Sequence, residues 1–419
     1  MIFNSAKEKY IFYNFPVILF SLIPFFLITG PFLSDLSVSL ICLLFLTYCL
    51  KKKNFSYFKN KYFYFFLIFW GYLILNTIIN NFNIDSLKIS FFYFRYGVFV
   101  IAVATFLDVD NKFIKYFFYC IFICFTALIL DGFYEYFVEA KGLQRVTSFF
   151  GEEKILGSYL SRLWPIFFGL SIFIFKQKKK LFLFFILIFI LSEVLVFLSG
   201  ERAAFFYINL SAIFVLLFSR KLLKLRLIIL FLTALLLIII SFINPSAKER
   251  VIDRTLKQMN FVDKKTGEKN AIYIFSKEHT EIYKSAYKIF LDNKVLGAGV
   301  KNFRNLCANN ERYNTHRDSC SNHPHNTYLQ ILSETGIVGF AFFIFILLYY
   351  LKYVLKHLRK RLSGKYYFTD FEICILSGIA IYLWPFVPTG NVFNNWINIV
   401  MILNLPFLLW SRKLINIKK

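Results

Sequence analysis

The sequence predicts an all-α polytopic integral membrane protein with about 12 transmembrane helices and a small helical periplasmic domain. Three observations lead to this prediction. The 419 residues are 58% hydrophobic and only 17% charged, a composition too apolar for a soluble domain. Apolar runs of about 17 to 25 residues, the length that crosses a bilayer as a helix, recur along the chain. Short Lys and Arg clusters separate these runs, which is typical of cytoplasmic loops and argues against nucleic-acid binding despite the net charge of +25.

The apolar runs divide the chain into three parts. We expect transmembrane helices 1–9 within residues 1–243, an outer loop domain at 244–335, and helices 10–12 within 336–419. The first run continues past Pro31 without a small-residue cleavage site, so we expect a retained span and not a signal peptide. The predicted spans are 11–30, 31–50, 62–80, 88–108, 115–136, 156–175, 181–199, 203–219, 227–243, 336–353, 370–388 and 393–411.

The basic clusters predict the orientation of the chain. With the spans above, they all fall on one side, which the positive-inside rule makes the cytoplasmic side together with both termini. The opposite face then receives the loop 137–155, the turn 200–202, the segment 244–335 and the turn 389–395. Residues that look functional are far apart in sequence but share this face, as a site assembled between helices requires. The clusters lie at 51–53, 176–180, 220–226, 356–361 and 412–413.

The junction between the long polar segment and the next apolar run predicts a helix start. Pro324 disfavours helix before it, and Asn326 or Thr327 can cap the helix that follows, with Thr327 and Gln330 spaced as a capping box. His325 then lies at a helix mouth, where unpaired N–H groups and the helix dipole suit an anion. Further along, Gly336 and Gly339 would allow a neighbouring helix to approach closely.

Two of the seven cysteines differ from the others. Cys307 and Cys320 bracket a polar segment without metal-type spacing, whereas the other five lie in apolar runs and are expected to be packing residues. Outside the cytoplasm a disulfide between the pair is favoured over two free thiols. His323 and His325 are two residues apart and have no Cys or acidic partner at ligand spacing, so we expect no metal site and no cofactor.

The strongest motif is His325-Asn326, nine further residues, Gly336, two more, and Gly339. It resembles the signature of the O-antigen ligase family, and the resemblance covers roughly residues 140 to 345. Three other stretches resemble motifs of the same family: the glycine-rich segment 296–304, the arginine motif 199–202 and the earlier extracytoplasmic motif 145–151.

The resemblance implies a glycosyltransferase that moves a glycan from undecaprenyl diphosphate to a sugar of lipid A core. It places the reaction at the periplasmic face of the bacterial inner membrane, among membrane lipids and without metal. A neutral His325 can take the proton of a sugar hydroxyl. The guanidinium groups of Arg202 and Arg145 match the geometry of a diphosphate. The family usually carries another arginine in the outer domain. Here His279 stands at that place, four residues before Tyr283, and either His279 or Arg304 is expected to contribute.

Several interpretations stay open at this point. A polysaccharide polymerase or a protein O-oligosaccharyltransferase would use the same donor with another acceptor, and a lipid or polysaccharide transporter is the rival from a different class. The glycan, the acceptor and the oligomeric state are not readable from the sequence. The pair Asp108 and Asp110 resembles a metal-binding motif of sugar transferases, but its predicted cytoplasmic place favours a polar turn. Ionisable residues within apolar runs are expected to form structural ion pairs or to line the cavity: Arg95, Asp131, Arg162 and Glu193.

Overall fold

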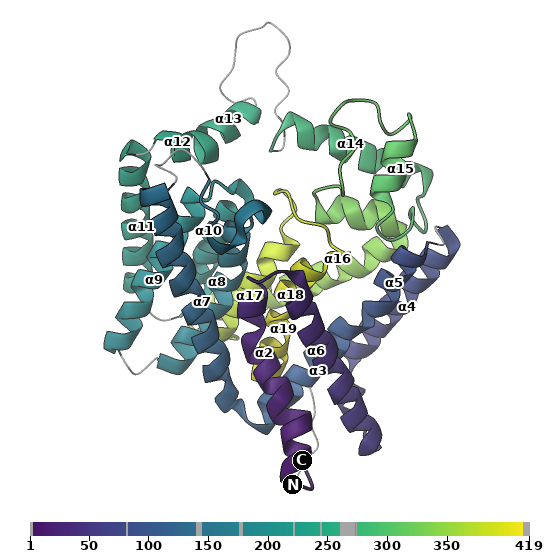
Figure 1. The fold of residues 1–419 in the computed structure, drawn as a ribbon, viewed down its shortest axis with the longest axis vertical. Coiled ribbons are helices and arrows are strands. Elements are labelled where there is room, and N and C mark those ends of the chain that lie inside the picture. The colour runs from purple at the N-terminus through teal and green to yellow at the C-terminus, as the bar shows by residue number, and fades with distance from the viewer. Residues whose placement is uncertain are drawn as a thin grey trace, which may run out of the picture.

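The protein is described by a computed structural model over residues 3–80, 83–139, 145–175, 179–220, 223–243, 245–259, 273 and 275–413. Every regular element within these residues is a helix (Figure 1). The elements are α1 (Ala6–Lys9), η1 (Tyr10–Asn14), α2 (Phe15–Phe26), α3 (Pro31–Lys51), η2 (Ser56–Phe58), α4 (Lys61–Asn80), α5 (Ile84–Phe92), α6 (Phe94–Val109), η3 (Asn111–Phe113), α7 (Ile114–Tyr134), η4 (Glu135–Glu139), η5 (Ser148–Glu153), α8 (Leu156–Phe175), α9 (Lys179–Leu198), α10 (Arg202–Phe218), α11 (Leu223–Ile243), α12 (Pro245–Lys248), η6 (Glu249–Asp253), α13 (Arg254–Gln258), α14 (Lys277–Asp292), α15 (Phe303–Asn309), α16 (Thr327–Leu362), α17 (Asp370–Leu383), α18 (Asn395–Ile402) and α19 (Asn404–Ser411).

Helix is found in each of the twelve predicted spans. By length and hydropathy, however, the described residues contain eight candidate spans, against about twelve predicted. Among the described residues there are also three shorter apolar helices, of 10 to 17 residues: Phe184–Leu198, Arg202–Phe218 and Asn395–Ser411. The eight candidates are Ala6–Phe26, Pro31–Lys51, Lys61–Asn80, Ile84–Val109, Asn111–Val138, Leu156–Phe175, Arg226–Ile243 and Thr327–Leu362.

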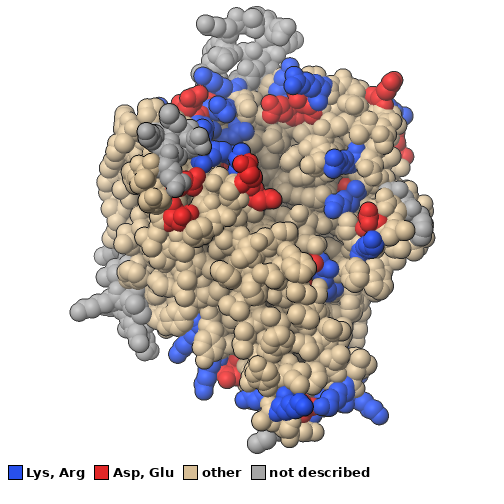
Figure 2. All heavy atoms as spheres, viewed as in Figure 1, with Lys and Arg blue, Asp and Glu red and all other residues tan. Residues whose placement is uncertain are grey.

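Helix α8 lies at the centre of the bundle. Most of its side chains are buried, and it packs against α9, α10 and α17. Both chain ends lie at one end of the molecule, and α12 to α15 lie at the opposite end (Figure 1). On the face drawn in Figure 2, Lys and Arg side chains gather toward these two ends, and the belt between them is mostly uncharged.

The end opposite the termini carries a small helical unit formed by α14 and α15. Ile282, Ala286 and Ile289 follow one another at helical spacing and form a buried cluster with Phe303 of α15. A disulfide joins Cys307 to Cys320 and encloses the loop beside this cluster. The unit rests on the N-terminal half of α16, so its own packing fixes the surroundings of the predicted helix start.

The charge-rich part of the outer segment is helical where the structure describes it. Helices α12, η6 and α13 cover residues 245–258. Residues 260–269 of this part lie outside the described residues, as do Lys176, Lys178 and Lys221 of the basic clusters.

Candidate functional site

The site begins at a tight turn between α9 and α10. Gly200 has a φ of +66°, a backbone conformation that suits glycine. The carboxylate of Glu201 accepts hydrogen bonds from the N–H of Gly157 at 2.6 Å and from the N–H and hydroxyl of Ser158 at 3.0 and 2.8 Å. Burial raises the pKa of Glu201, while these hydrogen bonds act to lower it. This contact ties the start of α10 to the start of α8 and so fixes the residue that follows, Arg202.

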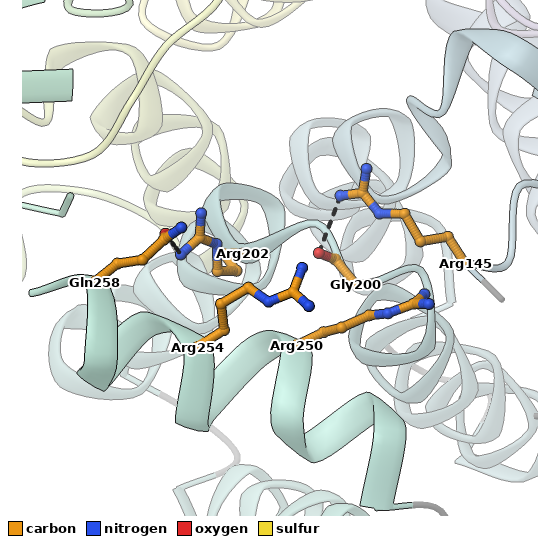
Figure 3. A pocket seen from close by; sticks show the side chains of 6 residues that line it. All are labelled: Arg145, Gly200, Arg202, Arg250, Arg254 and Gln258. Atoms are coloured by element: carbon orange, nitrogen blue, oxygen red, sulfur yellow. Dashed lines mark hydrogen bonds between the residues drawn. The ribbon is translucent and has the colours of Figure 1, made fainter. Parts of the chain in front are cut away.

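Arginine side chains from three separate parts of the chain meet above this turn (Figure 3). Nη2 of Arg145 donates to the carbonyl oxygen of Gly200 at 3.1 Å. Nη1 of Arg202 donates to Oε1 of Gln258 at 2.5 Å. Arg250 and Arg254 project from η6 and α13 toward the same place. They enclose a cavity of about 400 Å³, which we call the arginine cavity. It is lined by Arg145, Gly200, Arg202, Arg250, Arg254 and Gln258.

The arginine cavity concentrates positive charge. The described residues that line it include four guanidinium groups and no carboxylate. Burial lowers the pKa of Arg250, and the nearby charges of Arg145 and Arg254 lower it further, which shows that the cations repel one another. Guanidinium forks pair with phosphate oxygens in two parallel hydrogen bonds. A multiply charged anion such as a diphosphate is therefore the ligand whose charge this cavity would balance.

Three histidines form a second group at the same end of the molecule. The ring of His325 lies 4.0 Å from that of His323 and 5.5 Å from that of His279, measured between centroids. Nε2 of His325 is 3.0 Å from the hydroxyl of Ser321, and Nδ1 of His279 is 2.7 Å from the hydroxyl of Ser276. Across the described residues, no group of three His, Cys, Asp or Glu has the arrangement of a metal site.

The histidine group is tuned toward the neutral imidazole. Burial, with the neighbouring rings of His323 and His279, lowers the pKa of His325 to about 3. Burial, with the charge of Arg202 and the ring of His323, lowers the pKa of His279 to about 4. At neutral pH these rings therefore hold no positive charge and keep one nitrogen as a proton acceptor. Negative charge in the arginine cavity would raise the pKa of His279, since it would offset the effect of Arg202.

The two groups are connected through Phe275. Its ring centroid lies 4.7 Å from the guanidinium carbon of Arg202 and 5.2 Å from the ring of His279. The backbone of Phe275 has a φ of +79°, which is unusual for an aromatic residue. Such strained positions persist only where the surrounding structure holds them, and they cluster at functional sites.

A segment from the C-terminal part of the chain holds the start of α16. Asn326 is the N-cap: its Oδ1 accepts from the N–H of Tyr328 and Leu329, and its Nδ2 donates to the carbonyl oxygen of Pro385 at 2.8 Å. The N–H of Thr389 donates to the carbonyl oxygen of His325 at 2.9 Å, which supports the φ of +54° at His325. We call residues 383–392 the C-terminal strap.

The strap also explains why the predicted capping box is absent. The side chain of Gln330 donates to Asn391 at 2.9 Å and accepts from the N–H of Val392 at 3.0 Å, so it reaches across to the strap and not back to the helix start. The prediction of Thr327 and Gln330 as a capping box was therefore wrong, and the alternative cap, Asn326, is the observed one.

The signature glycines form a close backbone contact behind His325. Gly336 interrupts α16 with a φ of +63°, and Gly297 opposite has a φ of +77°. A Cβ on either would collide with the backbone of the other segment. The N–H groups of Ala298 and Gly299 donate to the carbonyl oxygens of Ser333 and Glu334 at 2.9 and 3.0 Å. The close neighbour of Gly336 is thus the turn at 294–299 and not a helix, whereas Gly339 faces Tyr72 of the helix α4.

Only some of the predicted site residues lie together in the structure. Arg145 and Arg202 share the arginine cavity, and His279 lies beside His325. Arg304 is exposed on α15 and is not among the residues lining that cavity. Arg250 and Arg254 were not among the residues predicted for the site, although their spacing of four residues would have placed them on one helix face.

Of the ionisable residues within apolar runs, two have clear structural partners. Nη2 of Arg95 lies 2.6 Å from Oδ1 of Asp35, an ion pair. Asp131 accepts a hydrogen bond from Ser148 at 2.6 Å. The guanidinium of Arg162 lies over the ring of Tyr207, 5.0 Å from its centroid. Glu193 is buried and does not line the arginine cavity.

The many apolar helices indicate a polytopic helical membrane protein, which carries an arginine-lined cavity and a histidine group at one end. Residues 182–344 match the sequence model of the family described as O-antigen ligase. The matched region contains Arg202, Arg250, Arg254 and the three clustered histidines, whereas Arg145 and the C-terminal strap lie outside it. No curated protein matches the chain.

Proposed function

We propose that this protein is a metal-independent, inverting glycosyltransferase of the bacterial inner membrane. In this proposal it moves a glycan from undecaprenyl diphosphate to a sugar of lipid A core at the periplasmic face, and both termini are cytoplasmic. One observation carries the proposal. A four-arginine cavity and a neutral histidine group lie at the same end of the molecule, joined through Arg202, Phe275 and His279.

The arginines would act on the leaving group. The diphosphate carries several negative charges, which increase on the bridging oxygen as its bond to the anomeric carbon breaks. Guanidinium groups fixed beforehand stabilise this charge without reorganisation. Arg145 is held by the Gly200 carbonyl and Arg202 by Gln258, so both are already oriented. The polyprenyl tail would remain among the apolar helices.

His325 would act on the acceptor. Its neutral ring takes the proton of the attacking sugar hydroxyl, and the resulting oxygen forms a bond to the anomeric carbon as the carbon–phosphate oxygen bond breaks. Attack from the side opposite the leaving group inverts the anomeric centre. His279 stands where the family usually has an arginine. In this role it would add no charge at neutral pH, since burial and Arg202 keep its pKa low.

The test is a transfer assay with the purified protein in detergent or lipid nanodiscs. Undecaprenyl-diphosphate glycan is supplied with lipid A core, a free glycan or a protein acceptor, each with and without a chelator. His325→Ala and Arg202→Ala are compared with His316→Ala and Arg317→Ala, which change exposed residues of the same outer segment. We expect glycan on lipid A core, unaffected by the chelator and by both control variants. We expect a loss of about a hundredfold or more in the two site variants.

The other outcomes assign a different function. Elongated lipid-linked glycan would identify a polymerase, and glycan on the protein acceptor would identify a protein O-oligosaccharyltransferase. Full transfer by His325→Ala would remove the proposed base. Transfer to none of the acceptors, with the donor still bound, would favour a transporter.

A further inference from the structure

A second cavity adjoins the arginine cavity and differs from it in chemistry. It has a volume of about 300 Å³ and shares Gln258 with the arginine cavity. The Gln258 side chain, whose Oε1 accepts a hydrogen bond from Arg202 at 2.5 Å, lines both cavities. A ligand that extends past this side chain would therefore contact both. The second cavity is lined by Lys257, Gln258, Tyr273, Ser276, Lys277 and Glu278.

These side chains offer hydrogen bonds of both kinds and one aromatic ring. Lysine ammonium groups donate, the Glu278 carboxylate accepts, and the amide and hydroxyl groups do both. The lining is too polar for a polyprenyl chain. It carries two basic groups and one acidic group, a smaller excess of cations than the four guanidinium groups of the arginine cavity. A sugar carries closely spaced hydroxyl groups and a weakly apolar ring face. The hydroxyl groups can pair with the donors and acceptors of this cavity, and the ring face can pack on the tyrosine ring.

The second cavity is also placed correctly relative to the arginines and histidines. The hydroxyl of Ser276 lies 2.7 Å from Nδ1 of His279, whose ring is 5.5 Å from that of His325. The N–H of Tyr273 donates to the carbonyl oxygen of Met259 at 3.2 Å, which fixes the aromatic edge of the cavity close to α13. The wall of this cavity is therefore one hydrogen bond from the histidine group and shares a side chain with the arginine cavity.

We propose that the second cavity binds the donor glycan through the sugars nearest the diphosphate. This inference rests on the proposed function, since it takes the diphosphate to occupy the arginine cavity. The donor sugar is bonded directly to that diphosphate, so the group that extends past Gln258 is carbohydrate. Binding it there would hold the anomeric carbon between the arginines and His325 and would let the protein distinguish a glycan-bearing lipid from the glycan-free product.

The test compares two ligands and uses binding alone as its readout. Dissociation constants are measured in nanodiscs for glycan-bearing undecaprenyl diphosphate and for glycan-free undecaprenyl diphosphate. The site variants are Tyr273→Ala and Lys277→Ala. Their matched controls are Tyr287→Ala and Lys284→Ala, which change exposed side chains of α14 that do not line the cavity. Arg202→Ala reports on the arginine cavity.

We expect the wild-type protein to bind the glycan-bearing lipid about tenfold more tightly, the size of one or two net hydrogen bonds. Tyr273→Ala and Lys277→Ala should reduce this preference several-fold while affinity for the glycan-free lipid stays unchanged, which also shows that the variants are folded. The control variants should keep the full preference. Arg202→Ala should weaken binding of both lipids equally.

The experiment distinguishes a failure of the glycan site from a failure of the proposed function. Equal affinity for both lipids in the wild type, or an unchanged preference in Tyr273→Ala and Lys277→Ala, would overturn the glycan site while leaving the diphosphate site intact. Binding of neither lipid, or no effect of Arg202→Ala, would overturn the proposed function itself.

Discussion

The backbone carbonyl oxygen of Thr389 lies 3.1 Å from Nε2 of His323. A carbonyl oxygen only accepts, so His323 must carry its proton on Nε2 and keep Nδ1 as the acceptor. The N–H of the same Thr389 donates to the backbone of His325. One residue of the C-terminal strap thus fixes the orientation of one histidine and the backbone of its neighbour, although the strap lies outside the region that matches the family.

This relationship predicts that His323 is a positioning residue for His325. We expect His323→Ala to lower kcat for transfer about tenfold with little change in the donor KM, since the ring packed against His325 at 4.0 Å would be lost. His323→Gln should recover most of the rate, because its amide N–H can still donate to Thr389. Steady-state kinetics of the three proteins measure this. Equal losses in both variants would argue against the proposed role of the donated proton.

The buried histidines predict a loss of stability in acid. Their pKa values, about 3 for His325 and about 4 for His279 in the folded protein, lie below the usual 6.5. Between pH 6.5 and about 4 the unfolded chain therefore binds more protons than the folded one, so the free energy of unfolding falls as pH falls through this range. The stability that the neutral histidines contribute to the folded protein is fully present above pH 6.5.

The check is the thermal midpoint at about pH 7.5 and about pH 5. We expect the wild-type midpoint to drop more on acidification than that of the His279→Gln, His325→Gln double variant. A single His316→Gln variant, at an exposed histidine outside the group, should behave like wild type. An equal drop in the double variant would show that other groups cause the acid sensitivity.

Arg254 gives a prediction about donor affinity. It lines the arginine cavity, and its charge acts on both Arg250 and Arg202. We expect Arg254→Gln to raise the donor KM by about tenfold, the value of one charge-assisted hydrogen bond. Its thermal midpoint without donor should stay the same or rise slightly, since one repulsive charge is removed. A lower midpoint together with the raised KM would indicate general damage to α13.

For Arg304, the sequence and the structure lead to different predictions about donor binding. The glycine-rich motif suggested it as a phosphate ligand, but it is exposed on α15 and does not line the arginine cavity. We expect Arg304→Ala to keep the donor KM within about twofold of wild type, as is common for exposed side chains without a specific contact. A tenfold increase measured in the same assay as Arg254→Gln would show that Arg304 reaches the donor.

The sequence predicted local features of the fold better than the long-range contacts that build the site. Local signals were sufficient where neighbours in sequence decide the structure: Asn326 as N-cap, and helix within each predicted span. Arg250 and Arg254 face the site only because η6 packs beside the start of α10, a long-range contact. The strap is a similar case, since Gln330 bonds to residues about sixty positions away and not to its own helix start.

The contact between Gly297 and Gly336 predicts a large cost for a single methyl group. In Gly336→Ala the new Cβ would meet Val295 and Gly297 backbone atoms, in a conformation (φ +63°, ψ −168°) that only glycine adopts readily. Gly364 is the matched control, because it has a similar φ of +72° but open space around it. Strain alone should cost Gly364→Ala about 1 kcal/mol, whereas strain and collision together should cost Gly336→Ala about 3 kcal/mol or more.

Thermal or denaturant midpoints of the two variants measure this difference directly. The collision would also push the 294–299 segment away from α16 and disturb the backbone behind His325, so Gly336→Ala should lose transfer activity even below its unfolding temperature. Gly364→Ala, far along the chain from the histidine group, should retain it. Similar stability losses in the two variants would mean that the backbone conformation, and not the close approach of the two segments, is what requires glycine at position 336.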